Sequence, residues 1–258
     1  MITLTDVSLA IDGAPILRNV TLTVKEGETM VILGPSGAGK SSILKIILGI
    51  WKPDTGVVRI EDTDIVPLRE EEMLPYRRMM GMVFQGNALF DSMTVRENIE
   101  YFLREQGKLR HGEIGRRVAE VLDSVNMQGT EDMYPEELSG GMKKRIAIAR
   151  AISASPRMLL YDEPTTGLDP VNARAIDELI NRFKGKGTTS IVVTHILHDA
   201  FAVGDSYAVM SDGAIVAAGS ADDILASEDE TVKKILEEFR DEASLPRTGA
   251  STVPYSII

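Results

Sequence analysis

The sequence predicts an α/β fold with a mostly parallel sheet core, an N-terminal antiparallel β lobe and an inserted helical lobe. Three observations predict it. Short apolar runs such as residues 30–33 alternate with helix-like segments, as expected for strands buried on both faces between helices. Residues 2–11 instead alternate apolar with polar side chains, which is typical of half-exposed antiparallel strands. Residues 94–127 have only helical periodicity, which indicates a helical insertion.

The individual elements follow from these local patterns. A second alternating strand is expected over residues 20–24, and the strand at 30–33 leads through a glycine-rich turn into a helix over residues 40–50. The remaining expected elements are buried strands at 157–161 and 190–193 and helices over residues 143–154, 170–183 and 196–203.

Composition narrows the class of protein. The chain has 258 residues, 43% of them apolar and 26% charged, which excludes disorder, collagen and a coiled coil as overall descriptions. It has no cysteine, so disulfides, thiolate metal sites and thiol nucleophiles are excluded. A net charge of -11 makes nucleic acid a poor partner. Residues 46–51 form too short an apolar run to cross a bilayer, and residues 1–6 lack a secretory pattern. We therefore expect a soluble protein of a reducing compartment.

A phosphate-binding loop is the strongest motif. The pattern G-x-x-x-x-G-K-S lies between an expected strand and an expected helix. Glycines let backbone N–H groups converge on a phosphate, and Lys40 adds a full positive charge. A chance glycine-rich turn would match about once in a hundred chains of this length. The expected nucleotide ligands are Gly34, Pro35, Ser36, Gly37, Ala38, Gly39, Lys40, Ser41 and Ser42, and the Ser41 hydroxyl is also an expected Mg²⁺ ligand.

Two adjacent carboxylates follow the strand expected at residues 157–161. Asp162 at the strand end would lie beside the phosphate loop and hold Mg²⁺, directly or through water. Glu163 would point toward the γ-phosphate and activate a water molecule as a general base. Acidic strand ends are common, so the assignment depends on the phosphate loop.

A third element is Leu138-Ser139-Gly140-Gly141-Met142, which precedes a helix and offers a second set of backbone donors. Taken alone it is a common helix-capping turn. In order along the chain stand the phosphate loop, Gln85, this segment, Asp162-Glu163, Gly167-Leu168-Asp169 and His195. That order resembles the nucleotide-binding subunit of ATP-binding cassette (ABC) transporters, over about residues 1–220.

The resemblance implies roles for six further residues. Gln85 would contact Mg²⁺ and the attacking water and relay to a membrane partner. Ser139, Gly140 and Gly141 would reach the γ-phosphate bound by the opposite subunit. Asp169 would shape the dimer interface, and His195 would contact the γ-phosphate. In isolation, a loop glutamine is usually solvated and a histidine beside an apolar strand usually belongs to the core.

Two departures from the family pattern stand out. Ile11 occupies the region where many relatives have an aromatic residue that stacks on adenine, so base selectivity is expected to be loose. The signature ends in Met142, where transport ATPases usually have glutamine. This ending, with residues 84–99 and 102–105, resembles the ATPases of lipid transporters that serve mammalian-cell-entry (Mce) proteins, including the maintenance-of-lipid-asymmetry (Mla) system.

The resemblance implies a cofactor and partners. Two copies would enclose two Mg-ATP molecules head to tail, and a separate permease and an Mce-type lipid-binding protein would complete a phospholipid transporter. The chain would lie peripherally on the cytoplasmic face of the inner membrane. Alternatives are an ABC ATPase for another solute, a soluble ABC protein acting on DNA or ribosomes, and a module that binds ATP without turnover. Phe84, Leu89, Phe90 and Met93 form either an apolar socket for a permease helix or part of the core of the lobe, and neither reading is favoured over the other.

Domain organisation follows the same reasoning. Residues 1–220 are expected to form the ATPase domain, with the helical lobe at about residues 86–140. Residues 221–258 would add a helix and an extended tail. An apolar stripe on that helix (Val232, Ile235, Leu236 and Phe239) must pack on something, most often its own domain. The tail beyond Pro246 is expected to contact the neighbouring ATPase. Small basic groups, including residues 143–145, are interpreted as solvated helix faces.

Overall fold

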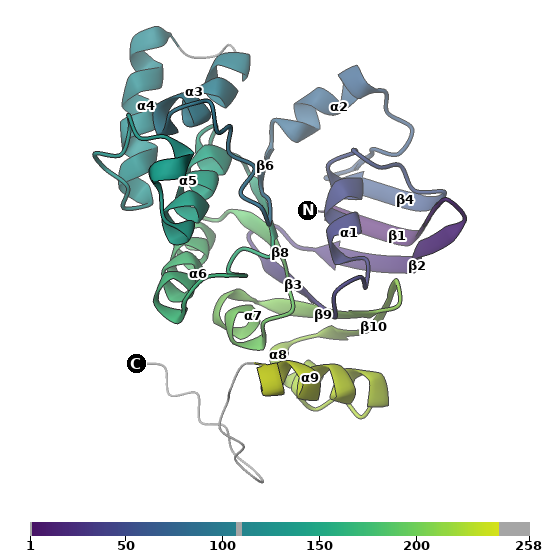
Figure 1. Ribbon diagram of the computed structural model, residues 1–258. Coiled ribbons are helices and arrows are strands. Elements are labelled where there is room, and N and C mark those ends of the chain that lie inside the picture. The colour runs from purple at the N-terminus through teal and green to yellow at the C-terminus, as the bar shows by residue number, and fades with distance from the viewer. Residues whose placement is uncertain (1, 107–109, 243–258) are drawn as a thin grey trace.

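Two β-sheets form the framework of the protein, which the computed structural model describes at residues 2–106 and 110–242 (Figure 1). The four-stranded antiparallel sheet has the order β2–β1–β4–β5, with β1 at Ile2–Ile11, β2 at Ala14–Val24, β4 at Thr55–Ile60 and β5 at Thr63–Asp64. The six-stranded sheet has the order β10–β9–β3–β8–β7–β6, with β10 at Ala214–Gly219, β9 at Ser206–Ser211, β3 at Thr29–Leu33, β8 at Thr189–Thr194, β7 at Met158–Asp162 and β6 at Met80–Val83.

The six-stranded sheet is parallel except at β10, which pairs antiparallel with β9. Leu33 pairs with Thr194, Asp162 with Val193, and Val83 with Tyr161. The carboxyl ends of β3, β8, β7 and β6 therefore meet at one edge, which is where ligands bind in open α/β sheets. The expected fold, with its antiparallel β lobe and mostly parallel core, is confirmed.

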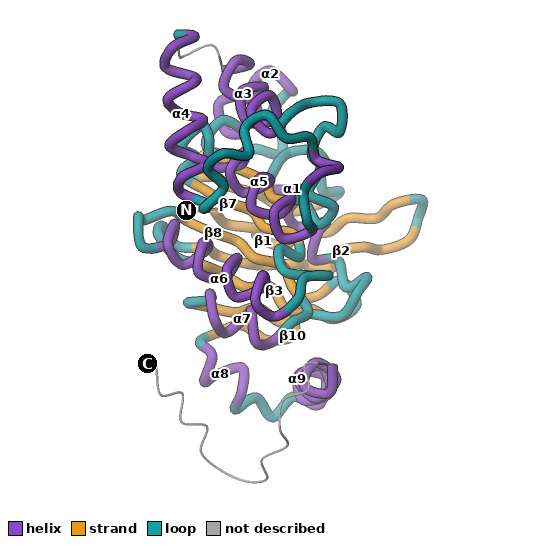
Figure 2. Tube along the Cα trace, turned by 60° about the vertical axis from the view of Figure 1, so that its left-hand side comes forward, coloured by secondary structure: helices purple, strands orange, loops and turns teal. Residues whose placement is uncertain are grey.

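The helices pack around this framework. They are α1 at Lys40–Ile47, α2 at Glu70–Arg77, α3 at Val95–Gln106, α4 at His111–Ser124, α5 at Gly140–Ile152, α6 at Pro170–Lys184, α7 at Leu197–Val203, α8 at Ala221–Leu225 and α9 at Glu230–Glu242, with a 3₁₀ turn at Pro135–Glu137. Figures 1 and 2 show α3, α4 and α5 grouped at one end of the molecule, away from α9.

Two hydrophobic clusters cover opposite faces of the six-stranded sheet. Leu159 and Tyr161 point into the cluster that contains residues of α3 to α7 and α9. Met158 and Leu160, their neighbours along β7, point into the cluster shared with α1 and the antiparallel sheet. This alternation explains the uninterrupted apolar run in the sequence, because a strand covered on both faces needs apolar residues at every position.

Some element boundaries differ from the expectations, for local reasons. Helix α1 ends at Ile47 rather than residue 50, because Gly49 takes a left-handed φ of 66° just after the helix. Helix α5 begins three residues early, at Gly140, because the Ser139 side chain accepts a hydrogen bond from the Met142 N–H at its start. Strand β2 begins at Ala14, because Asp12-Gly13, both with positive φ, forms a tight turn that extends the hairpin with β1.

Helix α9 belongs to the same core as the sheet. Its apolar stripe (Val232, Ile235, Leu236 and Phe239) is buried in the cluster that also contains α6 and α7. The helix contacts α7 and β10, and it lies below both in Figures 1 and 2. The expectation that the stripe packs on its own domain is therefore confirmed. The expected tail contact beyond Pro246 lies outside the described residues.

Candidate nucleotide-binding and hydrolysis site

The phosphate loop connects β3 to α1, as the sequence predicts. Gly39 lies immediately before α1 with φ 98°, and a Cβ atom there would come within 2.8 Å of Leu17 Cδ2. Gly37 has φ 83°, and no atom lies within 4 Å of the place a Cβ would take. Packing requires a glycine at position 39. Gly37 instead leaves open space where backbone N–H groups can receive a phosphate.

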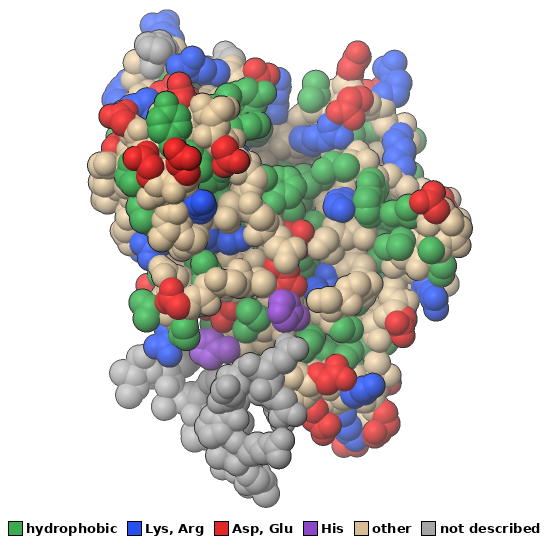
Figure 3. Space-filling model, in the orientation of Figure 1, with side chains coloured by type: hydrophobic (Ala, Val, Ile, Leu, Met, Phe, Trp, Pro, Cys, Tyr) green, Lys and Arg blue, Asp and Glu red, His purple; other side chains and the backbone are tan. Residues whose placement is uncertain are grey.

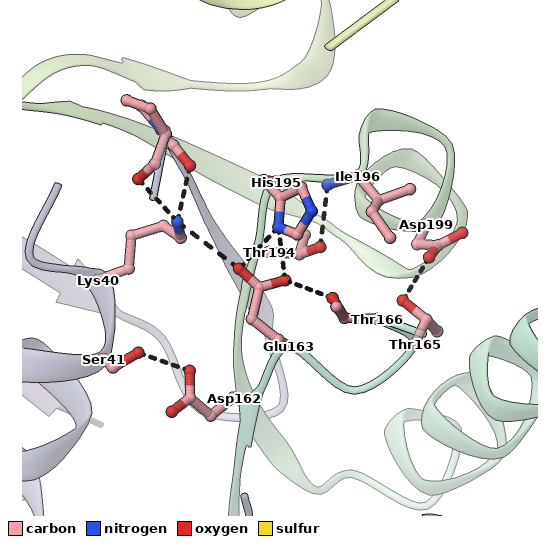
Figure 4. A network of polar contacts seen from close by, with 12 residues as sticks. Lys40, Ser41, Asp162, Glu163, Thr165, Thr166, Thr194, His195, Ile196 and Asp199 are labelled. Carbon is pink, nitrogen blue, oxygen red and sulfur yellow. Dashed lines mark hydrogen bonds and ion pairs between the residues drawn. The ribbon is translucent and has the colours of Figure 1, made fainter. Parts of the chain in front are cut away.

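Lys40 places its ammonium group at the mouth of this loop. Its Nζ donates to the carbonyl of Gly34 at 2.7 Å and to that of Pro35 at 3.1 Å, and it lies 3.6 Å from Glu163 Oε1 (Figure 4). Burial lowers the pKa of Lys40, while the carboxylates of Glu163 and Asp162 act in the opposite direction. The ammonium is thus held inside the loop, where it can neutralise phosphate charge.

Ser41 and Asp162 meet across the gap between α1 and β7. Ser41 Oγ donates to Asp162 Oδ1 at 2.7 Å (Figure 4). Burial is the largest influence on Asp162 and raises its pKa, the hydrogen bond from Ser41 lowers it, and the nearby charge of Glu163 raises it. A hydroxyl and a carboxylate oxygen side by side fit the oxygen ligands that Mg²⁺ prefers.

Glu163 is held at the centre of the polar network in Figure 4. Its Oε2 accepts from Thr166 Oγ1 at 3.0 Å and lies 2.9 Å from His195 Nδ1. Its backbone has a positive φ of 48°, and its N–H donates to the Val193 carbonyl at 3.0 Å. A left-handed non-glycine residue costs of the order of 1 kcal/mol and is found preferentially at functional sites.

Gln85 follows β6 at the same sheet edge. Its side chain is exposed and forms no hydrogen bond within the described part of the chain. Its carbonyl accepts from Lys144 Nζ at 3.0 Å, and the same ammonium lies 3.4 Å from the Phe84 carbonyl. Gln85 thus lies at the same sheet edge as Ser41 and Asp162 but, within the described residues, forms no hydrogen bond with either.

Lys144 corrects one sequence-based interpretation. Residues 143–145 were expected on a solvated helix face, yet only 2% of Lys144 is exposed. Burial lowers its pKa, while Asp162 and Glu163 raise it. Lys144 thus ties α5 to the loop that carries Gln85, a role that only tertiary packing reveals. Arg150, also on α5, donates to the carbonyls of Asn87 and Ala88 in the same loop.

The second set of expected nucleotide ligands lies apart from the phosphate loop. Ser139 begins α5, and Asp169 begins α6, where its carboxylate accepts from the backbone of Val171 and Asn172. A Cβ on Gly141 would come within 2.5 Å of Asn172 Oδ1, so the two helix starts are neighbours. Among the described residues, no hydrogen bond or ion pair joins Ser139, Gly140, Gly141 or Asp169 to residues 34–42.

A parallel α/β sheet with a phosphate loop, a hydroxyl–carboxylate pair and a buried glutamate beside histidine defines a phosphate-loop nucleotide hydrolase. The family model described as "ABC transporter" matches residues 17–166, more than half of the chain. The chain therefore belongs to the ABC transporter family and is an ATP-binding, ATP-hydrolysing cassette of that family.

Several curated relatives are similar at comparable levels. The Haemophilus influenzae intermembrane phospholipid transport system ATP-binding protein MlaF is 36% identical over 222 residues, covering 86% of this chain and 84% of that protein. The Natronomonas pharaonis phosphate import ATP-binding protein PstB 2 is 38% identical, covering 87% and 81%. The Mycobacterium tuberculosis probable ribonucleotide transport ATP-binding protein mkl is also 38% identical, and the match covers 86% of this chain but spans only 62% of mkl.

Solved structures of cassettes share the fold. The dimeric structure of MJ0796, a bacterial ABC transporter cassette, has a TM-score of 0.79 and 34% identity, covering 85% of this chain and 98% of that one. A post-hydrolysis dimer of the same cassette bound to ADP and Pi has a TM-score of 0.79 and 33% identity. Within residues 2–106 and 110–242, this chain has no helix with the length and apolar character needed to span a membrane.

Proposed function

We propose that this chain is the Mg²⁺-dependent ATPase subunit of a membrane transporter that moves phospholipids between envelope membranes. The proposed ATPase activity is supported above all by the contact network that joins Lys40, Glu163 and His195 beside the Ser41–Asp162 pair (Figure 4). The phospholipid part rests on the Mla-like sequence features and on the similarity to MlaF.

Individual residues of the chain can be given separate roles in the proposed hydrolysis. The loop glycines and Lys40 would hold the β- and γ-phosphates, and Ser41 and Asp162, joined by Gln85 from the same sheet edge, would hold Mg²⁺. The ion, when bound, neutralises charge that develops on the phosphates. Glu163 accepts a proton from the attacking water, and Thr166 and His195 orient its carboxylate. His195 follows β8 as Glu163 follows the neighbouring strand β7, so its ring would also be placed to donate to the γ-phosphate.

A second copy of the chain supplies the remaining ligands in this proposal. Ser139, Gly140 and Asp169 are exposed and Gly141 is buried beside Asn172, and within the described residues none of the four forms a hydrogen bond or ion pair with the phosphate loop of its own chain. Two chains arranged head to tail would bring each Ser139 to the partner's nucleotide with two-fold symmetry. The cassette described as dimeric MJ0796 supports this arrangement by analogy.

A permease docks at the exposed side chains around α3 in this proposal. Phe84 is 39% exposed, and Phe90 is 41% exposed and packs against Tyr101 with ring centroids 5.2 Å apart. Leu89 packs against the main core instead. Of the residues considered as a socket, Phe84 and Phe90 are therefore available to a partner, whereas Leu89 belongs to the core. Figure 3 shows hydrophobic side chains gathered between the helical end and the part carrying α1 and α2. The chain would then lie peripherally on the cytoplasmic face of the inner membrane.

The decisive experiment is purification from membranes through a tag on this chain, followed by mass spectrometry of proteins and lipids. Co-purification of a permease, an Mce-type protein and phospholipid is the expected result. A permease with a different solute receptor would keep the transporter ATPase and overturn the lipid substrate, an outcome that the similarity to PstB 2 makes worth testing. A soluble dimer without membrane partners would overturn the transporter assignment.

A further inference from the structure

Three side chains beneath the hydrolysis site form a compact group that the proposed function leaves without a role. They are Asp177 on α6 and His198 and Asp199 on α7. One ligand atom from each lies within 4.8 Å of the other two. Asp177 and Asp199 are 5% and 7% exposed, whereas the His198 side chain is 53% exposed. The group thus has a buried carboxylate floor and an imidazole open to solvent.

Asp177 is the anomalous member. Both of its carboxylate oxygens are buried and have no hydrogen-bond partner in the described part of the chain. Burial, then the charges of Asp199 and Glu178, raise the pKa of Asp177 to about 8. A buried carboxylate without a partner is strongly unfavourable, so Asp177 keeps its proton near neutral pH unless a cation takes the proton's place, and within the described residues no cationic side chain pairs with it.

Asp199 is held in position for a ligand. Thr165, two residues after Glu163, donates its hydroxyl hydrogen to Asp199 Oδ2 (Figure 4). The other oxygen, Oδ1, lies 3.3 Å from His198 Nδ1. Metal-binding carboxylates are usually oriented in this way, by a hydrogen bond to the oxygen that does not face the metal.

We propose that Asp177, His198 and Asp199 bind a divalent transition-metal ion of the Zn²⁺ class. Two carboxylate oxygens and one imidazole nitrogen are suitable ligands for Zn²⁺, which leaves a fourth position for water. Two carboxylates also balance the charge of the ion. The exposed His198 supplies the route of entry and can adjust its rotamer to close the site.

The lack of a hydrogen bond to Asp177 within the described part of the chain argues against a proton shared between its carboxyl group and that of Asp199. A proton held between two carboxyl groups requires a short oxygen–oxygen hydrogen bond. No oxygen of Asp177 forms a hydrogen bond within the described residues, although the ligand atoms cluster within 4.8 Å. In a tetrahedral Zn²⁺ site with bonds of about 2.0–2.1 Å the ligand atoms lie about 3.4 Å from one another, so the three side chains, whose ligand atoms lie within 4.8 Å of one another, would have to move only slightly to close on an ion.

The proposed ion would join three segments that reach the nucleotide. Thr165 lies two residues after Glu163, Asp199 is the third residue of α7 and lies four residues after His195, and Asp177 lies on the helix that starts after Asp169. Binding would therefore stiffen the hydrolysis site from below without contacting ATP. This role is independent of which solute the transporter carries.

Zinc titration of the full-length, nucleotide-free chain tests the proposal. The protein is stripped with a chelator, and Zn²⁺ binding is followed by calorimetry, with stoichiometry from elemental analysis. The expected result is one equivalent of Zn²⁺ in the unaltered chain. Affinity should fall at least tenfold in Asp177→Asn and in His198→Ala. Bound Zn²⁺ should raise the thermal unfolding midpoint of the unaltered chain but not of Asp177→Asn.

Two control variants make the assignment specific. Glu178→Gln changes the neighbouring exposed carboxylate on α6 and should bind Zn²⁺ normally. The double variant Glu163→Gln/His195→Ala removes the other carboxylate–histidine pair and should also retain the full equivalent. Absence of stoichiometric binding in the unaltered chain, or equal affinity in folded Asp177→Asn, would overturn the proposal.

Discussion

Glu163 is the residue on which the proposed hydrolysis depends most. Its carboxylate lies within 3.6 Å of the Lys40 ammonium and 2.9 Å of His195 Nδ1, and it is almost fully buried. The positive φ of 48° turns the chain sharply at the end of β7 and directs this side chain at the phosphate loop rather than into the sheet. A carboxylate so placed can accept a proton from a water molecule beside the γ-phosphate.

Replacing Glu163 by Gln is expected to lower the rate of ATP hydrolysis at least 100-fold, the usual contribution of general-base catalysis. ATP affinity should change little, because Lys40 and the loop backbone remain. Steady-state phosphate release and equilibrium nucleotide binding measure the two effects separately. As a control, Thr166→Val, which removes only one hydrogen bond to Oε2, should lower the rate much less. Full turnover in Glu163→Gln would refute the assigned role.

Asp177 predicts a pH dependence of folding in the chelated protein. Its pKa is raised to about 8 in the folded chain from an ordinary value near 3.8. The folded state therefore binds more protons than the unfolded state between these values. The contribution of Asp177 protonation to the free energy of unfolding is fully present below about pH 4 and is lost as pH rises through about 8.

Urea unfolding of the metal-free protein at pH 6.5 and 8.5 should reveal the effect. The free energy of unfolding should fall by of the order of 1 kcal/mol per pH unit at most. In Asp177→Asn this part of the slope should disappear, while Glu178→Gln keeps it. Saturating Zn²⁺ should also remove it from the unaltered chain, because the ion replaces the proton. An unchanged slope in Asp177→Asn would exclude Asp177 as the titrating group.

At the scale of elements, α9 links the C-terminal part of the chain to the hydrolysis site. Phe239 is 5% exposed, and its ring meets that of His195 edge to face with centroids 6.4 Å apart. The helix also packs on α7, which follows His195 directly. An element distant in sequence thus supports the orientation of a residue that contacts Glu163.

Phe239→Ala should therefore impair both stability and turnover. Loss of a buried phenyl ring costs about 3 kcal/mol, measured by urea unfolding. The freed His195 ring should also lower kcat several-fold at unchanged ATP affinity. Phe239→Leu, which keeps most of the packing volume, should restore most of the stability. If kcat per folded Phe239→Ala molecule equals that of the unaltered chain, α9 has only a packing role.

Elements with a local sequence signal were predictable, whereas contacts that depend on packing between elements were not. The phosphate loop and β3 were, because glycine spacing and an uninterrupted apolar run are local signals. The burial of Lys144 and the juxtaposition of Asp177 with Asp199 were not. Both depend on how α5, α6 and α7 pack, and a lysine or aspartate looks solvated in any single helix. Strand β10 was also missed, because Ala214–Gly219 is half-exposed and lacks clear alternation.

At the scale of the whole molecule, the two proposed sets of phosphate ligands lie apart from each other. The phosphate loop, Asp162 and Glu163 lie at the carboxyl edge of the parallel sheet, whereas Ser139 and Gly141 begin α5 beside the start of α6. If both sets act on one nucleotide, the site is completed either by a second chain, as proposed, or by a movement of the helical lobe within one chain. The dimer proposal therefore predicts that two differently inactivated chains restore activity when they are mixed, which a chain with a complete site of its own would not do.

Mixing two inactive variants distinguishes these cases. Lys40→Ala removes the phosphate-loop cation, and Ser139→Arg blocks the donor set at the start of α5. In a mixed dimer, the Ser139→Arg chain contributes an intact phosphate loop to one site, and the Lys40→Ala chain contributes an intact Ser139 to that same site. Half of the dimers in an equal mixture are mixed, and each has one complete site of two. Hydrolysis should therefore recover to about a quarter of the unaltered rate.

Each variant alone, at the same total concentration, serves as the control and should stay inactive. Affinity tags of two kinds verify that mixed dimers form. Recovery then requires that Ser139 act on the nucleotide held by Lys40 of the other chain, since neither variant carries both residues. If mixed dimers are isolated and remain as inactive as the parents, the nucleotide site is completed within one chain. The separation of α5 from the phosphate loop would then have to close by movement of the helical lobe.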